Sequence, residues 1–317
     1  MKIYNNTNLN LKHKKGVIAV GNFDGLHLGH QKVIKEAKIA AKKLKLPFGV
    51  MTFEPMPVMF FNKKIKNHRI NSINQKKNYL KKLKLDFLII IKFNKQFSSL
   101  TPEKFIEKII YEKINCKYLY ISRNFKFGFK RKGNLKTLKF FEKKFGYKTV
   151  ITNPYKKNKK IISSSMIRKK IASGKINEAN KLLGRKWSIE GKVIAGEKRG
   201  RKIGFPTCNL KLNNYLIPYP GVYAVKVDGN NFTKKGIANI GYRPTFNGQS
   251  LLLETNIFGI NKNLYNKVIN VHLKNFIRKE KKFKNIEELK KQIKIDIQKA
   301  KKYCLKIHYN FQKQPFQ

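Results

Sequence analysis

Two of the six histidines of this chain lie close together in a glycine-rich stretch that runs Gly21-Asn22-Phe23-Asp24-Gly25-Leu26-His27-Leu28-Gly29-His30. Glycines let a backbone turn sharply and approach a ligand closely, and histidines supply directional donors to a phosphate. An apolar run at 17–20 precedes the stretch, and apolar residues at helical spacing follow it. Strand, glycine-rich turn and helix form a phosphate-binding layout, because the first turn of a helix presents unpaired N–H groups and a positive dipole end to an anion.

This stretch suits a reaction that needs alignment and charge stabilisation more than a covalent nucleophile. The chain has no Ser/His/Asp arrangement and no P-loop motif. A triphosphate held here would be attacked at its α-phosphorus by another phosphate, with pyrophosphate leaving. We predict that His27 and His30 stabilise that transition state, although two loop histidines can also be structural.

A second polar stretch, Ile162-Ser163-Ser164-Ser165-Met166-Ile167-Arg168, follows the last strand expected in the first half. Ser164 or Ser165 has a plain interpretation as a helix cap. At a helix start, these hydroxyls and Arg168 also suit the far side of a triphosphate. We therefore keep this stretch as part of the candidate site.

The first half of the chain alternates strands and helices. Apolar runs predict strands near 17–20, 48–53, 87–93, 118–122 and 147–151, and helices near 30–45, 72–84, from 101 onward and near 135–145. Glu54-Pro55-Met56-Pro57 is expected to be a stiff loop, since two prolines so close together disfavour regular structure. This order predicts an α/β domain with a mostly parallel sheet, whose ligand lies at the carboxyl ends of the strands.

Short β-rich runs, broken by Gly, Pro and Asn, fill the second half and predict an antiparallel barrel or sandwich. They lie at 187–195, 221–227, 235–240, 251–258 and 268–273. A terminal helix follows, with Asn285 as its cap, Glu288 three residues later and an apolar stripe of Ile286, Leu289, Ile293 and Ile297. We predict two domains, 1–184 and 185–317, because 317 residues exceed the size of a usual single core.

Composition points to a compartment and argues against one class of partner. No export signal or membrane-length apolar run is present, and three distant cysteines suit a reducing environment, so we expect a cytoplasmic protein. The net charge of +55 invites a nucleic-acid hypothesis, but only nine of the 72 basic residues are arginine and the lysines are dispersed. We expect no dedicated nucleic-acid partner and no membrane partner; the oligomeric state stays open.

Several motifs of the first half resemble a known family. The stretch from Gly21 to His30 is similar to the H-x-G-H nucleotidylyltransferases. Together with Thr52-Phe53-Glu54-Pro55, Phe125-Lys126-Phe127-Gly128 and Ile162-Ser163-Ser164, it resembles the FMN adenylyltransferase (FAD synthetase) module of the prokaryotic bifunctional riboflavin kinase/FAD synthetases. The resemblance implies a Rossmann-like domain that adenylylates FMN to FAD. Its implied residues are His27, His30 and Arg168 for catalysis, Gly21, Phe23, Asp24, Gly29, Ser164 and Ser165 for ATP, and Asn124, Phe125 and Phe127 for flavin.

The resemblance continues in the second half. Gly200-Arg201-Lys202-Ile203-Gly204-Phe205-Pro206-Thr207-Cys208-Asn209-Leu210 is similar to the G-R-x-x-G-F-P-T-A-N stretch of the riboflavin kinase module, and three further motifs follow in the family's order. The resemblance implies a β-barrel that phosphorylates riboflavin to FMN with ATP and Mg²⁺. Its implied residues are Glu254 as general base, Thr207 and Asn209 for Mg²⁺, Gly200, Lys202, Gly204 and Thr207 for ATP, and Arg278 for flavin.

Each of these kinase roles has a structural alternative. The turn before Thr207 can simply open a strand, and Arg278 can form a surface ion pair with Glu280. Two rival functions also remain: a single-function H-x-G-H adenylyltransferase with a degenerate barrel, and a non-enzymatic RNA-binding protein. The P-T-x-N stretch with Glu254 argues against the first, and the dispersed charge argues against the second.

Some positions depart from the family pattern. In the loop usually written G-x-D-F-R-F-G, the glycine and the acid are Ser122 and Asn124 here. Met56 replaces a common histidine, Ser165 and Met166 replace Thr and Arg, and Asn256 stands where a histidine often follows the kinase glutamate. These changes bear on flavin affinity in the first module more than on the type of reaction.

Overall fold

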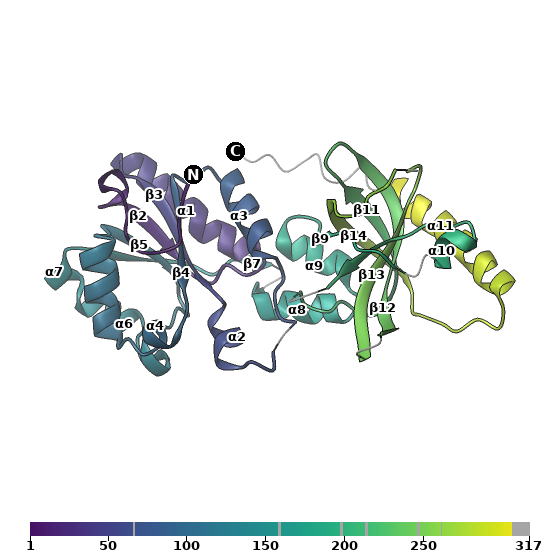
Figure 1. Cartoon of the computed structure of the whole chain (residues 1–317). Coiled ribbons are helices and arrows are strands. Elements are labelled where there is room, and N and C mark those ends of the chain that lie inside the picture. Colours follow the sequence, from purple (N-terminus) through teal and green to yellow (C-terminus); the bar gives the residue numbers. More distant parts are fainter. Residues whose placement is uncertain are drawn as a thin grey trace. The chain divides into compact units, whose positions relative to one another are not determined.

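The structure is a computed structural model that describes residues 1–305 except 66, 158–159, 197–198, 213–214, 246–247 and 261. It divides into two compact units (Figure 1). The first unit comprises Met1–Lys66 and Ile73–Ser164, and the second comprises Asn67–Ser72 and Ser165–Gln317. Six residues from the middle of the N-terminal half, 67–72, thus belong to the second unit.

The first unit is built on a six-stranded parallel sheet with the order β1-β4-β3-β2-β5-β6. From β2 the chain moves through β3 to β4 on one side, whereas β5 and β6 lie on the other side. Ligands of such sheets bind outside the carboxyl ends of the strands at this switch point, between β2 and β5. The strands are β1 (Lys2–Tyr4), β2 (Val17–Val20), β3 (Phe48–Glu54), β4 (Phe87–Lys92), β5 (Tyr118–Ser122) and β6 (Lys148–Thr152).

Helices cover both faces of this sheet. Ile18 of β2 faces a buried cluster that includes residues of the π-helix η2 (Phe105–Lys113) and of α6 (Leu135–Phe140). Val17 faces the opposite cluster, with residues of α1 (Leu28–Leu44) and α3 (Ile73–Lys82). Alternate residues of one strand point to opposite faces, so a fully apolar strand such as β2 serves two cores.

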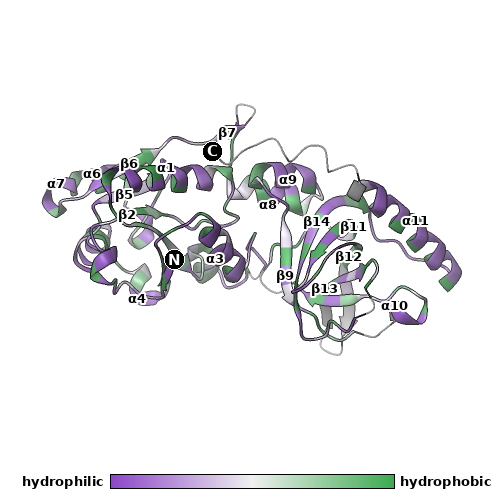
Figure 2. Cartoon of the chain, turned by 90° about the horizontal axis from the view of Figure 1, so that it is seen from above, coloured by the Kyte–Doolittle hydropathy of each residue, from purple (hydrophilic) through white to green (hydrophobic). Residues whose placement is uncertain are grey.

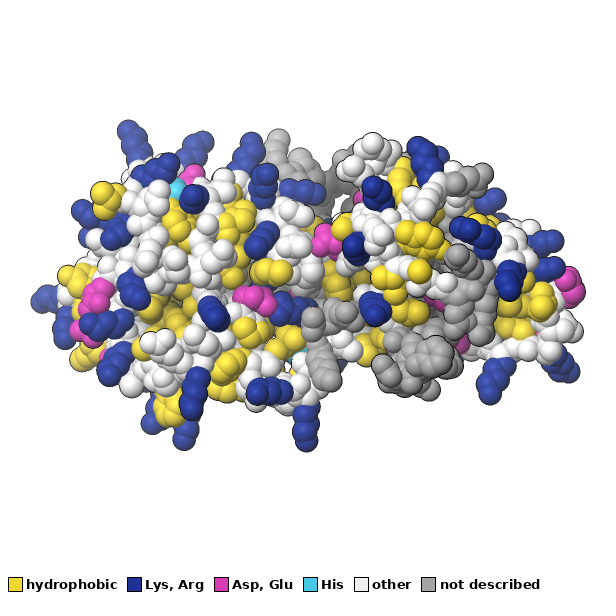
Figure 3. Space-filling model, in the orientation of Figure 1, with side chains coloured by type: hydrophobic (Ala, Val, Ile, Leu, Met, Phe, Trp, Pro, Cys, Tyr) yellow, Lys and Arg dark blue, Asp and Glu magenta, His cyan; other side chains and the backbone are white. Residues whose placement is uncertain are grey.

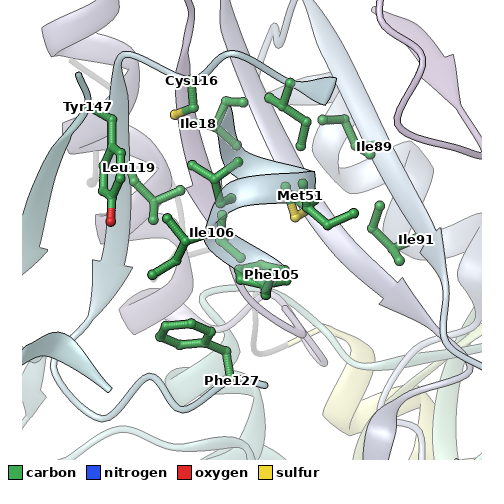
Figure 4. Close-up of a cluster of buried hydrophobic side chains, with 14 of the residues drawn as sticks. Ile18, Met51, Ile89, Ile91, Phe105, Ile106, Cys116, Leu119, Phe127 and Tyr147 are labelled. Atoms are coloured by element: carbon green, nitrogen blue, oxygen red, sulfur yellow. The ribbon is translucent and has the colours of Figure 1, made fainter. Parts of the chain in front are cut away.

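Figure 4 shows part of the first cluster, in which the rings of Phe105 and Phe127 lie 5.2 Å apart between centroids. Phe127 is therefore part of the core packing.

The remaining elements of this unit are η1 (Leu11–His13), α2 (Pro57–Phe61), α4 (Lys95–Ser98), α5 (Pro102–Lys104), η3 (Phe129–Arg131), α7 (Glu142–Phe145), β7 (Lys156–Lys157) and β8 (Lys160–Ile161).

Gly49 offers a test of how tightly this sheet is packed. It pairs in register with Phe87 of β4, and a Cβ placed on Gly49 would lie 2.2 Å from Cε2 of the Phe87 ring. Gly49→Ala should therefore lower the free energy of unfolding of the first unit by about 1–3 kcal/mol, measured by urea denaturation. Adding Phe87→Leu should recover part of the loss, and strictly additive losses would contradict this account.

The second unit is built on a six-stranded antiparallel sheet with the order β10-β13-β12-β11-β14-β9. A backbone hydrogen bond of 2.9 Å from Ile194 N–H to Asn209 O joins the segment after β9 to β10, so the outer strands meet and the sheet is nearly a barrel. Its strands are β9 (Ser188–Lys192), β10 (Cys208–Lys211), β11 (Gly221–Asp228), β12 (Thr233–Thr245), β13 (Gly248–Ile257) and β14 (Val268–Arg278). Its helices are α8 (Ser164–Ala172), α9 (Ile176–Leu183), α10 (Arg199–Lys202) and α11 (Ile286–Leu305).

The terminal helix α11 packs on this sheet, with Ala300 buried against Val222 and its neighbours. Figure 2 shows hydrophilic and hydrophobic residues along the same helix. The predicted cap is confirmed, since Asn285 Oδ1 accepts a 2.9 Å hydrogen bond from Glu288 N–H. The predicted apolar stripe is wrong at its start, because Ile286 is 58% exposed, whereas Asp296 on the packed face is 1% exposed. An acid can occupy that position because Arg278 pairs with it.

Most predicted elements are present, with shifted ends. The predicted helix at 30–45 begins at Leu28, so His30 lies in its first turn. The stiff loop predicted at 54–57 ends in a helix, because Pro57 occupies the first helical position of α2, where a missing N–H costs nothing. The helix predicted at 135–145 is divided into α6 and α7 at Phe141. The edge strand β1 was not predicted.

Residues 67–72, between α2 and α3, are anchored in the second unit by buried contacts. The indole N–H of Trp187 donates to Ile70 O at 2.6 Å, and Leu216 N–H donates to Arg69 O at 2.7 Å. The compact units otherwise divide after Ser164, so α8 and α9 lie with the second unit. The functional boundary after Gly184 stays a prediction.

On the face shown in Figure 3, lysine and arginine side chains are scattered and do not gather at one place. Among the residues that the structure describes, no helix is both long and apolar enough to cross a membrane.

Candidate functional sites

The glycine-rich loop leaves the carboxyl end of β2 at the switch point of the parallel sheet. Gly21 N–H continues the sheet with a 3.1 Å hydrogen bond to Met51 O. The chain then turns through three residues with positive φ, namely Phe23 at 46°, Gly25 at 80° and Leu26 at 39°. Two of these are not glycine, and such residues persist in this region only when their surroundings hold them there.

His27 and His30 lie together at the start of α1. His27 is the N-cap residue, and its Nδ1 accepts a 3.3 Å hydrogen bond from His30 N–H. The two imidazole rings stack with centroids 3.6 Å apart and planes 21° apart, and the Phe23 ring meets His30 edge-on at 5.3 Å. His27 is 4% exposed. The predicted pair thus sits where helix N–H groups and the helix dipole attract an anion.

The neighbouring predicted ATP residues shape the loop through their backbone. A Cβ on Gly29 would lie 3.1 Å from the His27 ring, and one on Gly21 would lie 3.3 Å from the Phe23 ring. Asp24 is 3% exposed, and its carbonyl accepts a 2.9 Å hydrogen bond from Ser164 Oγ. Ser164, the first residue of α8, is thus hydrogen-bonded to the loop, and its role in ATP binding stays a prediction.

Two other predicted residues of this site belong to the second unit. The first unit ends at Ser164, and Ser165 is the next residue of the chain and belongs to the second unit. Arg168 lies one turn further along α8. The Arg168 Nε–H donates to His68 O at 3.0 Å, within the segment that the first half gives to the second unit. Their roles in ATP binding and catalysis stay predictions.

The predicted flavin loop follows β5, on the other side of the switch point. Asn124 is exposed and Phe125 is half-buried, whereas Phe127 is 7% exposed and packs in the core. The rings of Phe125 and Phe127 stack with centroids 5.6 Å apart. Phe127 thus supports Phe125, and of the three predicted flavin residues Asn124 and Phe125 are the accessible ones.

The second candidate site is a polar row across three strands of the antiparallel sheet. Glu254 of β13 pairs in register with Asn209 of β10 on one side and with Asn239 of β12 on the other. Residues in register across antiparallel strands point to the same face. A half-buried carboxylate thus lies between two amides, and the exposed Thr207 lies two residues before Asn209, immediately ahead of β10.

The two asparagines each keep a buried amide oxygen for which the described residues provide no hydrogen-bond partner, Asn209 Oδ1 and Asn239 Oδ1. A Cβ on Gly196 would lie 1.8 Å from Asn209 Nδ2, so the amide packs directly on a bare backbone. On the other side, Asn239 Nδ2 donates to Glu280 Oε1 at 3.0 Å. Unsatisfied buried oxygens are costly unless a ligand completes them.

The loop before Thr207 is made compact by two glycines. Phe205 N–H donates to Gly200 O at 2.8 Å, and a Cβ on Gly200 would lie 2.5 Å from Phe205 O. Gly204 has a φ of 87°, which favours glycine, and Lys202 is exposed at the end of α10. Cys208, between Thr207 and Asn209, points to the opposite face, and burial raises the pKa of its thiol to about 11.

Arg278 of β14 lies two strands beyond Asn239 in the same register, with Val222 of β11 between them, and it is engaged by the terminal helix. Its Nε and Nη2 each approach Asp296 Oδ2 at 2.8 Å, and Nη1 donates to Lys279 O at 2.9 Å. The structural alternative for Arg278 was an ion pair with Glu280. Arg278 does form an ion pair, but its partner is Asp296. A flavin contact by Arg278 stays a prediction.

Sequence reasoning gave no role to two residues that the structure places beside these sites. Asn239 begins the stretch 239–246, which is one of the three further motifs that follow in the family's order and which was given no function; strand pairing brings Asn239 next to Glu254. Lys76, 3% exposed, donates to the carbonyl of Asn22 in the histidine loop at 2.8 Å. Nothing in the sequence marks Lys76 as a buried residue, because the chain contains so many lysines.

The fold and these two sites define a class of protein. A parallel α/β unit carries an H-x-G-H site at its switch point, and an antiparallel barrel-like unit carries a carboxylate flanked by amide oxygens. These are two candidate sites of unrelated construction, and each has side chains suited to phosphate chemistry.

Comparison with known proteins agrees with this description. Residues 9–166 match the FAD synthetase family, and residues 183–304 match the riboflavin kinase family. The chain is 42% identical over 301 residues to the bifunctional riboflavin kinase/FMN adenylyltransferase of Buchnera aphidicola subsp. Schizaphis graminum, which covers 93% of this chain and 96% of that protein. It is 41% identical over 296 residues to the protein of the same name from Bacillus subtilis, covering 91% and 92%.

A solved structure shares the fold over nearly the whole chain. The crystal structure of a protein described as a macrolide-efflux protein from Streptococcus pneumoniae superposes with a TM-score of 0.83 and 31% identity, over 94% of this chain and 98% of that one. The chain belongs to the family of bifunctional riboflavin kinase/FMN adenylyltransferases. The predicted family, fold class and pair of activities are confirmed.

Proposed function

We propose that this chain converts riboflavin to FAD in two steps with the residues described above. The observation that supports the proposal is that each unit brings together polar side chains suited to phosphate chemistry, a stacked histidine pair in the first unit and Glu254 between two amides in the second. The domains that we assign to the two steps are 1–184 for FMN adenylyltransferase and 185–317 for riboflavin kinase.

In the kinase step, Glu254 acts as general base. It takes the proton from the ribityl 5′-hydroxyl of riboflavin, the hydroxyl oxygen attacks the γ-phosphorus of ATP, and ADP leaves. Gly200, Lys202, Gly204 and Thr207 bind the nucleotide, and the compact turn from Gly200 to Phe205 lets the backbone approach it. Arg278 contacts the flavin or orders the strand end through Asp296.

In the adenylyl transfer, His27 and His30 act on the triphosphate. The FMN phosphate oxygen attacks the α-phosphorus of ATP, a P–O bond forms, and pyrophosphate leaves. The histidines and the first turn of α1 stabilise the charge that develops on the phosphate oxygens. Asp24, Ser164, Ser165 and Arg168 complete ATP binding, and Asn124 and Phe125 contact the flavin with Phe127 behind them.

Mg²⁺ fits the donor set of the second unit. Thr207 and Asn209 offer hard neutral oxygens, and Asn209 Oδ1 is buried and lacks a partner among the described residues. We infer that these two side chains hold Mg²⁺ together with ATP phosphates. When bound, the ion neutralises phosphate charge. In the described part of the chain no group of three or more His, Cys, Asp and Glu could hold a metal ion, and Mg²⁺ commonly binds through one or two protein ligands together with substrate phosphates.

Gly196 tests this assignment without touching a ligand. Gly196→Ala places a Cβ where Asn209 Nδ2 now lies, so the amide must move. We expect the Mg²⁺ concentration for half-maximal kinase rate to rise about tenfold, as for the loss of a residue that orients a metal ligand. Gly191→Ala is the matched control, since its Cβ would meet Leu210 Cδ2 at an ordinary 3.4 Å. An unchanged Mg²⁺ dependence in Gly196→Ala would argue against Asn209 as a ligand.

We further propose that the enzyme is cytoplasmic and has no dedicated nucleic-acid or membrane partner, on the grounds of its dispersed charge and short apolar runs.

One incubation tests the function as a whole. Purified full-length protein is mixed with riboflavin, ATP and Mg²⁺, and the flavins are separated by chromatography. We expect FMN first and FAD later, and chelation of Mg²⁺ should stop FMN formation. FAD from added FMN without FMN from riboflavin would favour the single-function alternative, and no flavin nucleotide at all would refute the proposal.

A further inference from the structure

Lys76 is a buried lysine in a chain whose other lysines are mostly solvated. It lies on α3 and is 3% exposed, whereas Lys81 and Lys82 of the same helix are exposed. Taking an ammonium group out of water is costly, so such a group needs close polar partners to be tolerated. Its partners therefore show what the buried charge is used for.

The ammonium of Lys76 holds one carbonyl of the histidine loop. Nζ donates to Asn22 O at 2.8 Å and lies 3.4 Å from Thr52 Oγ1. Thr52, fully buried on β3, itself donates to Asn22 O at 3.1 Å. Asn22 O therefore accepts hydrogen bonds from two buried side chains on different elements of the first unit.

This carbonyl immediately precedes the strained part of the loop. Phe23, the next residue, has a φ of 46°, and Leu26 has a φ of 39°. A side-chain-bearing residue adopts this region only when neighbouring contacts hold it. Releasing Asn22 O would allow the peptide before Phe23 to rotate toward an unstrained conformation.

The conformation of Phe23 is connected to the catalytic pair through its ring. The ring meets His30 edge-on at 5.3 Å, and it fills the space beside Gly21, where a Cβ would lie 3.3 Å away. A change in the Phe23 backbone therefore moves the surface on which His30 rests. His30 in turn stacks on His27 at 3.6 Å.

We propose that Lys76 is a positioning residue for adenylyl transfer, which holds Asn22 O so that the loop places Phe23, His30 and His27 for the triphosphate. The inference rests on the FMN adenylyltransferase activity proposed above. The buried positive charge behind the loop also favours the binding of an anion in front of it. A lysine that only tethered α3 to the sheet would contribute to stability without affecting the reaction.

The test uses the full chain, in which riboflavin kinase activity is an internal control. We expect Lys76→Met to lower kcat/KM for FMN adenylylation on the order of ten- to a hundredfold, mostly in kcat, because misplacing catalytic groups by about 1 Å costs this much. The kinase rate should stay at the wild-type value. Lys81→Met, on the exposed side of the same helix, should leave both activities unchanged.

A second pair of variants acts on the same carbonyl with little change in packing. Thr52→Val removes one hydrogen bond to Asn22 O, whereas Thr52→Ser keeps it, so only Thr52→Val should lower the adenylylation rate. Because both donors share one acceptor, the effects of Lys76→Met and Thr52→Val should be non-additive. If Lys76→Met fails to fold, the two Thr52 variants still test whether the hydrogen bonds to Asn22 O affect the adenylylation rate.

The outcomes separate this inference from the proposed function. If wild-type protein makes no FAD from FMN, the proposed function itself is refuted. If wild-type protein makes FAD, and Lys76→Met or Thr52→Val does so with wild-type kcat and KM for ATP, then Lys76 is structural only. A lower melting temperature with unchanged kinetics of the folded protein would overturn the inference in the same way.

Discussion

Replacing Glu254 with alanine is expected to abolish FMN formation from riboflavin while conversion of FMN to FAD continues at close to the wild-type rate. Glu254 is a half-buried acid, and strand pairing places it between Asn209 and Asn239. Without it, nothing in this row can take the proton of the 5′-hydroxyl. Loss of a general base costs on the order of a hundred- to ten-thousandfold in rate, measured as FMN released per minute at saturating riboflavin and ATP.

Two further variants separate loss of the base from loss of the fold. Glu254→Gln keeps the size of the side chain and its hydrogen-bonding capacity but cannot accept a proton, so it should be nearly as inactive as the alanine variant. Glu287→Ala removes an exposed acid that pairs with Lys290 at 2.8 Å, and it should leave both activities unchanged. An active Glu254→Gln enzyme would exclude Glu254 as the base and leave it only a binding role.

Both sites were predicted where the chemistry lies in one short stretch of sequence. The strand, the glycine-rich turn and the helix that carry His27 and His30 are consecutive, so local periodicity and spacing are enough to find them. Thr207 and Asn209 lie two positions apart in one motif, and their predicted roles come from the resemblance of that motif to the riboflavin kinase module. These patterns do not give the conformation of the loop: the helix begins at Leu28, and Phe23 has a positive φ, which a residue other than glycine adopts only when its surroundings hold it there.

The features that sequence reasoning missed depend on contacts between distant segments. Asn239 meets Glu254 through the register of β12 and β13, and a shift of one residue would turn it to the other face. Asp296 is buried because Arg278 reaches it from β14, which no helical pattern reveals. Residues 67–72 have no local mark that would assign them to the second unit, where Trp187 and Leu216 bind their carbonyls.

The same distinction applies to charge. Composition correctly predicts many solvated lysines, because the average lysine of such a chain is exposed. It cannot identify the exceptional one, since Lys76 differs from Lys81 only in the face of α3 on which it lies. Once the structure identifies a buried charge, its partners indicate a role more directly than its sequence context does.

Replacing His30 with alanine is expected to have the reverse effect of the Glu254 change, with FMN formation retained and FAD formation lowered on the order of a hundredfold or more. His30 lies in the first turn of α1, stacked on His27 at 3.6 Å, where it can donate to the phosphate oxygens as charge develops. A role confined to the transition state should lower kcat and leave KM for ATP nearly unchanged, measured with added FMN as substrate.

Because His30 also supports the His27 ring, its removal has a structural component that needs a control. His30→Gln restores a side-chain donor without the aromatic ring, and it should recover part of the adenylylation rate if donation to phosphate is the main role. If stacking is the main role, His30→Phe should perform better than His30→Gln. Loss of both activities in a well-folded His30→Ala protein would contradict independent sites, since the kinase reaction needs none of the residues around this loop.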